Sequence, residues 1–415
     1  MGKIKPVFSS AMFGQIIPSF LTIGFKFTAG LGLFFLIGNN VSEEVFAQFI
    51  VLLSLSTFVG YFVDFGFLLK LTTDFPTKGI GIATLESYYI RLILLTIVLL
   101  AIYMLSFIIS VDPLFFCILL NVVIGFFLES TSIQLRYQGK YWMDACFVFT
   151  ALVLPVLGAI YFLFQSESLK FIYFWMFGIK FFCFLPIFFF WLFRSRSEIS
   201  SLKDNFYKSV SFALDSLLLN AQPFLQLQAV ALFFPPAPLG FFAYAQKIIQ
   251  GFSVLFSAFN NVFFPKLVKA RGNVHTTSKL LKIFILSVSV LPMLVLCFFL
   301  IRGTGDLGLI INDIYEEYFF NIFIVMFIVI VKFNSGVIGS VLTANGHQKR
   351  RLKINSMAIV IETILLVALL GLMTTAVEMS LLVVLLSCVI VLISYVWVVK
   401  NENVITLPFS FAKKT

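Results

Sequence analysis

Apolar residues along the chain come in long runs that are separated by short polar segments. The runs are about 20 residues long, which is the length a helix needs to cross the hydrocarbon core of a bilayer. A span-length window predicts twelve helices, at 15–37, 45–68, 92–110, 114–134, 142–164, 171–193, 210–233, 239–264, 283–301, 318–343, 354–374 and 380–399. The pattern therefore predicts an all-α integral membrane protein.

Composition agrees with this pattern and excludes several other classes. Of the 415 residues, 60% are hydrophobic and 12% are charged, a ratio that neither a soluble core nor a disordered chain has. The 5 cysteines all lie in apolar runs without metal-binding spacing, and His275 and His347 fall in separate basic loops. We therefore expect no metal site and no cofactor. The chain also lacks a GxxxxGK[ST] motif, which argues against nucleotide-driven pumping.

The net charge of +10 is explained by the loops on one predicted side of the membrane. Nearly all loop lysines and arginines fall on that side, whereas the opposite loops carry Lys170, Arg302 and nine of the 19 acidic residues. Lys3 and Lys5 precede a span-length run without a cleavage site, so we expect a retained first helix. This distribution predicts cytoplasmic N- and C-termini. Because membrane topology explains the positive net charge, the charge does not indicate nucleic-acid binding.

Two short patterns recur about half a chain length apart. Segment 131–140 lies at the end of the predicted fourth helix and closes with Gln-Gly-Lys, while 338–347 lies at the end of the tenth and closes with Asn-Gly-His. Pro18 and Pro223 lie at a similar offset in the first and seventh helices. These offsets predict two six-helix lobes, 1–200 and 201–415. Both lobes enter the membrane in the same orientation, so they form a parallel repeat.

Several charged side chains lie inside the predicted helices. They are Lys26, Lys180, Lys247, Lys332 and the acid Glu362. A charge in the bilayer is expensive, so such residues normally face a bundle interior or a wet cavity. Each lysine also admits a structural interpretation, as a snorkelling side chain or as the partner of a carboxylate. Glu362 can be a counter-ion of Lys332 or a proton relay, and both interpretations remain open.

Polar residues share helix faces in four of the predicted spans. They are Gln15, Thr22 and Lys26 in the first helix, Asp215, Gln222 and Gln226 in the seventh, Lys247 in the eighth and Lys332 in the tenth. Lys180 joins them as a deep lysine without such a stripe. Because these helices come from both halves, we expect a central hydrophilic cavity between the lobes. Its lysines favour an anionic ligand.

Short motifs near the helix ends carry a family resemblance. They are Asp64-Phe65-Gly66 after the second helix, Tyr137-Gln138-Gly139 after the fourth, 242–247 early in the eighth, 263–267 at its end, and Ala344-Asn345-Gly346 after the tenth. Together with the twelve-helix layout, they resemble the Wzx family of O-antigen flippases. These are polysaccharide transporters of the superfamily that also holds the MATE exporters and the lipid II flippases.

The resemblance implies a specific transport activity. A Wzx-like protein moves undecaprenyl-pyrophosphate-linked oligosaccharide repeat units from the cytoplasmic to the periplasmic leaflet of the bacterial inner membrane, for lipopolysaccharide O-antigen synthesis. The resemblance also implies alternating access of the two lobes, coupling to an ion gradient, and contact with other membrane proteins of polysaccharide assembly. The family's cationic lumen corresponds here to the four lysines named above. Arg91 and Arg136 are assigned to loops, so no arginine at depth is expected to clamp phosphate bidentately.

The residues leave two other functions open. A MATE-like exporter of small cations is disfavoured by the lysines of the predicted cavity, and a membrane O-antigen polymerase or ligase is disfavoured by the short outer loops, of which 302–317 is the longest. Our mechanistic hypothesis is that Lys26 and Lys332 hold the pyrophosphate-sugar headgroup while the prenyl tail stays in lipid. Glu362 or Asp215 exchanges a proton during the return.

Overall fold

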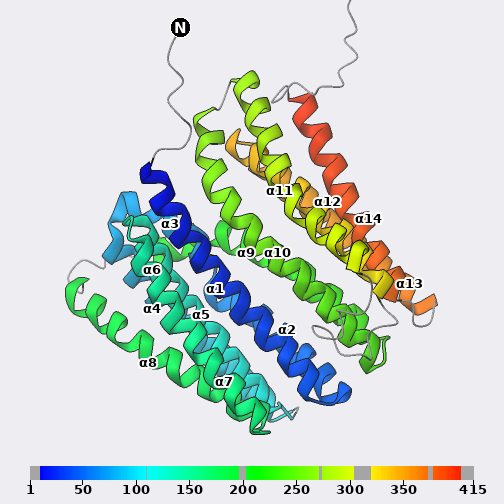
Figure 1. Ribbon diagram of the computed structural model, residues 1–415. Coiled ribbons are helices and arrows are strands. Elements are labelled where there is room, and N and C mark those ends of the chain that lie inside the picture. Colours follow the sequence, from blue (N-terminus) through cyan, green and yellow to red (C-terminus); the bar gives the residue numbers. More distant parts are fainter. Residues whose placement is uncertain are drawn as a thin grey trace, which may run out of the picture. The chain divides into compact units, whose positions relative to one another are not determined.

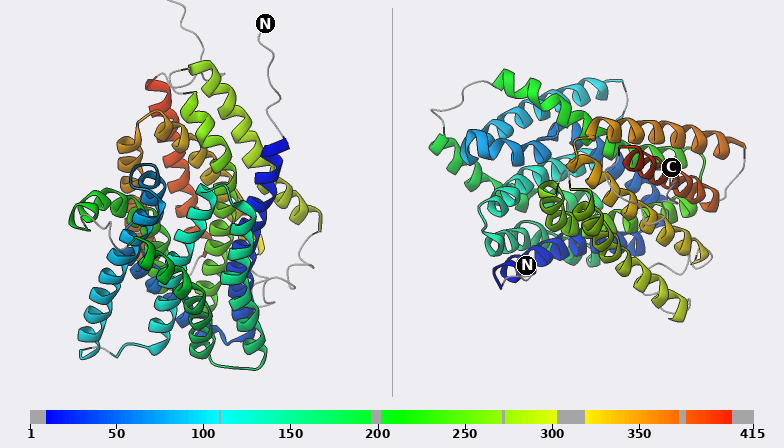
Figure 2. Two further views of the ribbon diagram at one scale, coloured as in Figure 1. Left: turned by 90° about the vertical axis from the view of Figure 1, so that its left-hand side faces the viewer. Right: turned by 90° about the horizontal axis from the view of Figure 1, so that it is seen from above.

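The computed structural model describes residues 10–108, 110–195, 202–270, 273–302, 319–372 and 377–402, which are helical apart from short connections (Figures 1 and 2). The chain divides into two compact units, Met1–Phe224 and Leu225–Thr415. This division falls inside a helix, whereas the sequence placed it in the loop before that helix, at 200/201. The two six-helix lobes of a parallel repeat stay a prediction.

Each unit is built from long helices joined by short connections. The first unit consists of α1 (Ser10–Asn40), α2 (Glu43–Asp64), α3 (Phe67–Lys78), α4 (Ile80–Ser106), α5 (Pro113–Tyr137), α6 (Tyr141–Val148), the π-helical turn η1 (Phe149–Val153), α7 (Leu154–Phe164), α8 (Leu169–Ser195) and most of α9 (Leu202–Ala231). The second unit takes the end of α9 and continues with α10 (Pro236–Lys269), α11 (Val274–Arg302), α12 (Phe319–Ala344), α13 (Gln348–Leu372) and α14 (Val377–Asn401).

Ten helical segments within the described residues are long and apolar enough to cross a membrane. They confirm a multi-pass helical membrane protein. The predicted seventh and eighth spans fall on α9 and α10, which are helical but are not among these ten. A count of twelve spans therefore stays a prediction.

The third predicted span begins too late in the sequence. Segment 69–91, taken as a loop, instead forms most of α3 and the first three turns of α4. Thr84, Glu86 and Arg91 lie in these turns and are buried. A hydropathy window misses such a stretch because its polar side chains are covered by the protein itself, so their burial leaves no mark on the average.

A glycine shapes the connection between α2 and α3. Phe65 and Gly66 have φ angles of 49° and 71°, in the left-handed region. A Cβ on Gly66 would lie 2.4 Å from the carbonyl carbon of Phe212 and 2.6 Å from the backbone nitrogen of Ala213, both in α9. Only glycine combines this backbone angle with this close approach. The Asp64-Phe65-Gly66 motif therefore has a direct structural role.

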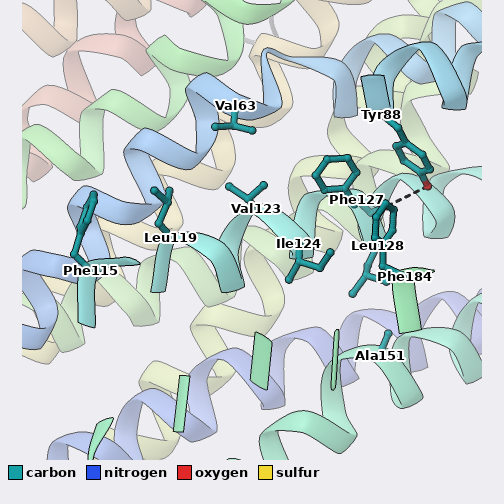
Figure 3. Packing of buried hydrophobic residues seen from close by; sticks show 10 residues of the cluster. All are labelled: Val63, Tyr88, Phe115, Leu119, Val123, Ile124, Phe127, Leu128, Ala151 and Phe184. Carbon is teal, nitrogen blue, oxygen red and sulfur yellow. Dashed lines mark hydrogen bonds between the residues drawn. The ribbon is translucent and has the colours of Figure 1, made fainter. Parts of the chain in front are cut away.

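The core of the first unit surrounds α5, which packs against α2, α3, α6 and α8. Figure 3 shows its buried side chains, among which the rings of Tyr88, Phe127 and Phe184 form a triangle with centroids 4.9–5.4 Å apart. In lipid, which is as apolar as these side chains, such a core is stabilised mainly by close dispersion contacts. Its shape complementarity fixes how the helices of this unit pack.

The second unit repeats part of this packing, although α11 packs extensively on α12 whereas its counterpart α4 barely contacts α5. The central helix of the second unit is α12, which lies between α10 and α14, as α5 lies between α2 and α8. By order along the chain, α10, α12 and α14 are the counterparts of α2, α5 and α8 in the predicted duplication. The correspondence agrees with the predicted duplication, which itself stays a prediction. In both units the last helix also packs on the one before it, α8 on α7 and α14 on α13.

Candidate functional site

A cluster of charged side chains joins α1 to α5. The Lys26 ammonium donates to Glu129 Oε2 at 2.5 Å, and Arg136 Nη2 donates to the other oxygen, Oε1, at 2.8 Å. Glu129 and Arg136 lie seven residues apart on α5 and so share a helix face. Lys26, which the sequence assigned to the substrate cavity, is thus ion-paired within its own unit.

A second carboxylate extends this cluster to α6. Asp144 accepts a hydrogen bond from Ser132 at 2.5 Å and lies 3.5 Å from both Arg136 Nε and Thr22 Oγ1. Thr22 also donates to the carbonyl of Pro18, which lies 2.9 Å away in the preceding turn of α1. Two cations and two carboxylates therefore balance here and hold α1, α5 and α6 together.

A separate ion pair lies at the heart of the first unit. The Arg91 guanidinium donates to Asp64 and, at 2.5 Å, to Ser130. It also lies 5.6 Å and 5.7 Å from the ring centres of Phe67 and Phe127. Both charged side chains are almost completely buried, at 0% and 1% exposed. The sequence analysis assigned Arg91 to a loop, whereas the structure places it inside α4 with its side chain buried among the helices.

Two of the predicted lysines have no acidic partner within the described part of the chain. Lys180 is 8% exposed and lies on the inner face of α8, at helical spacing from the buried Tyr173, Met176 and Phe184. Lys332, in α12, is partly buried. Neither side chain makes an ion pair with any described residue. Lys247 of α10 contacts Gln250 at 3.3 Å among its interactions.

The second unit holds a buried carboxylate beside two amides. Glu362 of α13 is 1% exposed and accepts a hydrogen bond from the Gln226 side chain of α9. The Gln246 side chain of α10 in turn donates to Gln226 at 2.9 Å. Glu362 and Lys332 form no ion pair, so the counter-ion interpretation of Glu362 lacks the direct contact it needs.

The predicted residues are thus divided between two separate groups. Thr22 and Lys26 belong to the charged cluster of the first unit, through Asp144 and Glu129, and Gln226 contacts Glu362 in the second. Gln222 is half-buried in α9, while the side chains of Gln15 and Asp215 lie outside those that the structure describes. The central cationic cavity between the lobes stays a prediction.

Sequence reasoning missed several members of these groups. Glu129, Asp144 and Gln246 were not among the predicted site residues, although Glu129 and Arg136 stand at a visible helical spacing. The contacts that join α1 to α5 and α9 to α13 link residues more than 100 positions apart, Lys26 with Glu129 and Gln226 with Glu362. No local pattern carries information about such pairs.

Comparisons with known proteins place this architecture. No family model and no curated sequence matches the chain. Among solved structures, it is similar to a MATE protein in the straight conformation, with 14% identity, 95% of each chain covered and a TM-score of 0.63. It is also similar to a multidrug resistance MATE family transporter of the MOP superfamily, in its outward-facing conformation (13% identity, 95% of each chain, TM-score 0.62) and its inward-facing conformation (14%, 94%, 0.61). The chain therefore has the fold of the MATE transporters.

Proposed function

We propose that this protein is a flippase for undecaprenyl-pyrophosphate-linked oligosaccharide repeat units of the O-antigen type. It moves them from the cytoplasmic to the periplasmic leaflet of the bacterial inner membrane by alternating access of its two lobes. The MATE-type fold and the many apolar helices support transport rather than catalysis. Polysaccharide chemistry and cytoplasmic termini rest on the sequence resemblance and the loop charges.

The observation that carries the substrate class is the presence of lysines without acidic partners in membrane helices. Lys180 and Lys332 have no ion pair among the described residues, although an isolated charge in the bilayer is expensive. Such residues are retained where they meet a ligand or a water-filled path. A pyrophosphate headgroup supplies the missing negative charge, because Coulomb attraction is strong where water is scarce.

The remaining polar residues take supporting roles in this proposal. Gln15, Thr22, Gln222 and Gln226 line the path with hydrogen-bonding groups suited to sugar hydroxyls, and Lys26 and Lys247 add positive charge. Glu362 and Asp215 exchange a proton during the return to the cytoplasm-facing state. Glu362 suits this role because it is buried beside neutral amides.

Reconstituted vesicles test the proposal directly. A labelled undecaprenyl-pyrophosphate oligosaccharide is added to one leaflet, and its arrival in the other is followed with a membrane-impermeant quencher. We expect Lys332→Ala to slow flipping about tenfold, the loss of one charge-assisted contact. Lys353→Ala, which removes an exposed lysine of α13, is the matched control and should leave the rate unchanged. Flipping equally fast in Lys332→Ala, Lys180→Ala and the control would refute the anionic substrate.

One observation favours a second function, the export of a small organic cation. The buried Glu362 carboxylate with two neighbouring amides is a set of groups that can accommodate positive charge. The solved structures of similar fold include a multidrug resistance transporter.

A deletion strain separates the alternatives. Single lipid-linked repeat units trapped on the cytoplasmic face support the flippase, whereas drug sensitivity with normal lipid intermediates supports the exporter. Units exposed outside but unpolymerised indicate a polymerase or ligase.

A further inference from the structure

The Glu129 carboxylate is held in the way that proteins hold a phosphate group. Its two oxygens are bound by two different cations from two helices, Lys26 at 2.5 Å and Arg136 at 2.8 Å. Charge-assisted bonds from an ammonium and a guanidinium to neighbouring oxygens of one anion are a common arrangement for phosphate recognition. The same donors would meet two oxygens of a phosphate at similar positions.

The side chains of this cluster are partly exposed, unlike those of the Arg91–Asp64 pair in the same unit. The side chains of Lys26, Glu129 and Arg136 are 20%, 26% and 28% exposed. Arg91 and Asp64 are sealed in the core at 0% and 1%. An incoming anion can therefore approach the first group, whereas the second group is closed to any ligand.

Arg136 is positioned by contacts that do not depend on Glu129, whereas Lys26 is placed by the backbone of α1. Arg136 Nε lies 3.5 Å from Asp144, which Ser132 in turn binds, and Arg136 Nε also donates to the Ser132 carbonyl at 3.3 Å. Lys26 is carried by α1 one turn beyond Thr22, which is tied to the carbonyl of Pro18. If Glu129 swings away, Asp144 is the one carboxylate of this cluster that remains beside the two cations. The excess positive charge then favours another anion at the position of the Glu129 carboxylate.

We infer that Lys26 and Arg136 form a binding subsite for the pyrophosphate group of the substrate, and that Glu129 fills this subsite when no substrate is bound. The inference rests on the proposed function for the identity of the ligand. Pyrophosphate displaces the carboxylate because it offers more negative charge and more oxygens to the same donors. In this subsite Arg136, which the sequence analysis assigned to a loop, supplies a guanidinium that can bind phosphate oxygens. Arg136 stands in the last turn of α5, at the end predicted to face the cytoplasm, where the substrate is loaded.

The exchange is tested by binding of inorganic pyrophosphate to the detergent-purified protein, measured by isothermal titration calorimetry. Glu129→Gln removes the competing charge and should tighten binding on the order of tenfold. Adding Arg136→Gln to Glu129→Gln should abolish that gain. Glu402→Gln is the matched control, because it likewise frees a paired arginine, Arg350, at an exposed position, and it should bind as the wild type does.

Further variants and a second ligand complete the test. Glu129→Asp keeps the charge on a shorter side chain, so it should fold as the wild type does and bind with intermediate affinity. Undecaprenyl pyrophosphate in lipid nanodiscs should compete with inorganic pyrophosphate, and failure to compete overturns the assignment to a lipid headgroup. The subsite itself is refuted if Glu129→Gln gains no affinity or if Glu402→Gln gains as much. Flipping in vesicles is measured separately with the wild-type protein. If the wild type flips the lipid but Glu129→Gln gains no affinity for pyrophosphate, the subsite is rejected and the flippase is kept. If Glu129→Gln gains affinity but the wild type does not flip the lipid, the flippase is rejected and the subsite is kept.

Discussion

The buried Arg91–Asp64 pair makes the most quantitative prediction of this structure. The two side chains are 0% and 1% exposed, and Arg91 also donates to Ser130 and lies 5.6 Å and 5.7 Å from the ring centres of Phe67 and Phe127. Asp64→Asn leaves the guanidinium buried without its counter-ion, and Arg91→Met likewise leaves the Asp64 carboxylate buried without a counter-ion. Each should lower the free energy of unfolding by about 3–5 kcal/mol, the usual effect of breaking a buried pair.

The double variant distinguishes this explanation from a general packing effect. With both charges gone no uncompensated ion remains, so the combined loss should fall short of the sum of the single losses by at least about 2 kcal/mol. Unfolding is measured in mixed micelles with increasing sodium dodecyl sulfate, following helical circular dichroism. Lys170→Met, which breaks an exposed 3.8 Å contact with Asp112, is the control and should change stability by less than about 1 kcal/mol. Strictly additive single losses, or an Asp64→Asn loss as small as that of the control, would refute the reasoning.

Three further predictions concern a turn, the core and the second unit. Gly66→Ala should destabilise the protein by about 1–3 kcal/mol from backbone strain alone, with a further loss from the 2.4 Å approach to Phe212, and the same unfolding assay checks it. Phe184→Ala opens a cavity in the aromatic core and should cost about 3–5 kcal/mol in that assay, whereas a loss under about 1 kcal/mol would show that the site collapses without penalty. Glu362→Gln keeps a hydrogen-bond acceptor for Gln226 but removes the titrating group, so flipping in vesicles should no longer respond to an imposed proton gradient. A response equal to that of the wild type would remove Glu362 from the coupling.

The polar clusters also change what the buried charges say about function. The sequence suggested that the membrane interior carries several unneutralised lysines. In the structure, Lys26 is balanced by Glu129, while Lys180 and Lys332 keep no acidic partner among the described residues. The case for an anionic substrate therefore rests on fewer lysines than the composition implied. It gains a guanidinium, Arg136, that the loop assignment had set aside.

The sequence by itself determined the class of protein and most of its helices. Apolar runs of about 20 residues must be helical in a bilayer, because every backbone N–H and C=O has to be bonded within the segment, and this rule needs no tertiary information. The tertiary structure decided where the polar residues go. Segment 80–91 belongs to α4, where the buried charge of Arg91 is neutralised by Asp64 of α2. The charge of Lys26 is likewise neutralised by Glu129, which lies 103 positions away along the chain. Hydropathy measures the mean solvent preference of neighbours in sequence, whereas the state of a buried charge depends on one partner brought from a distant helix by packing.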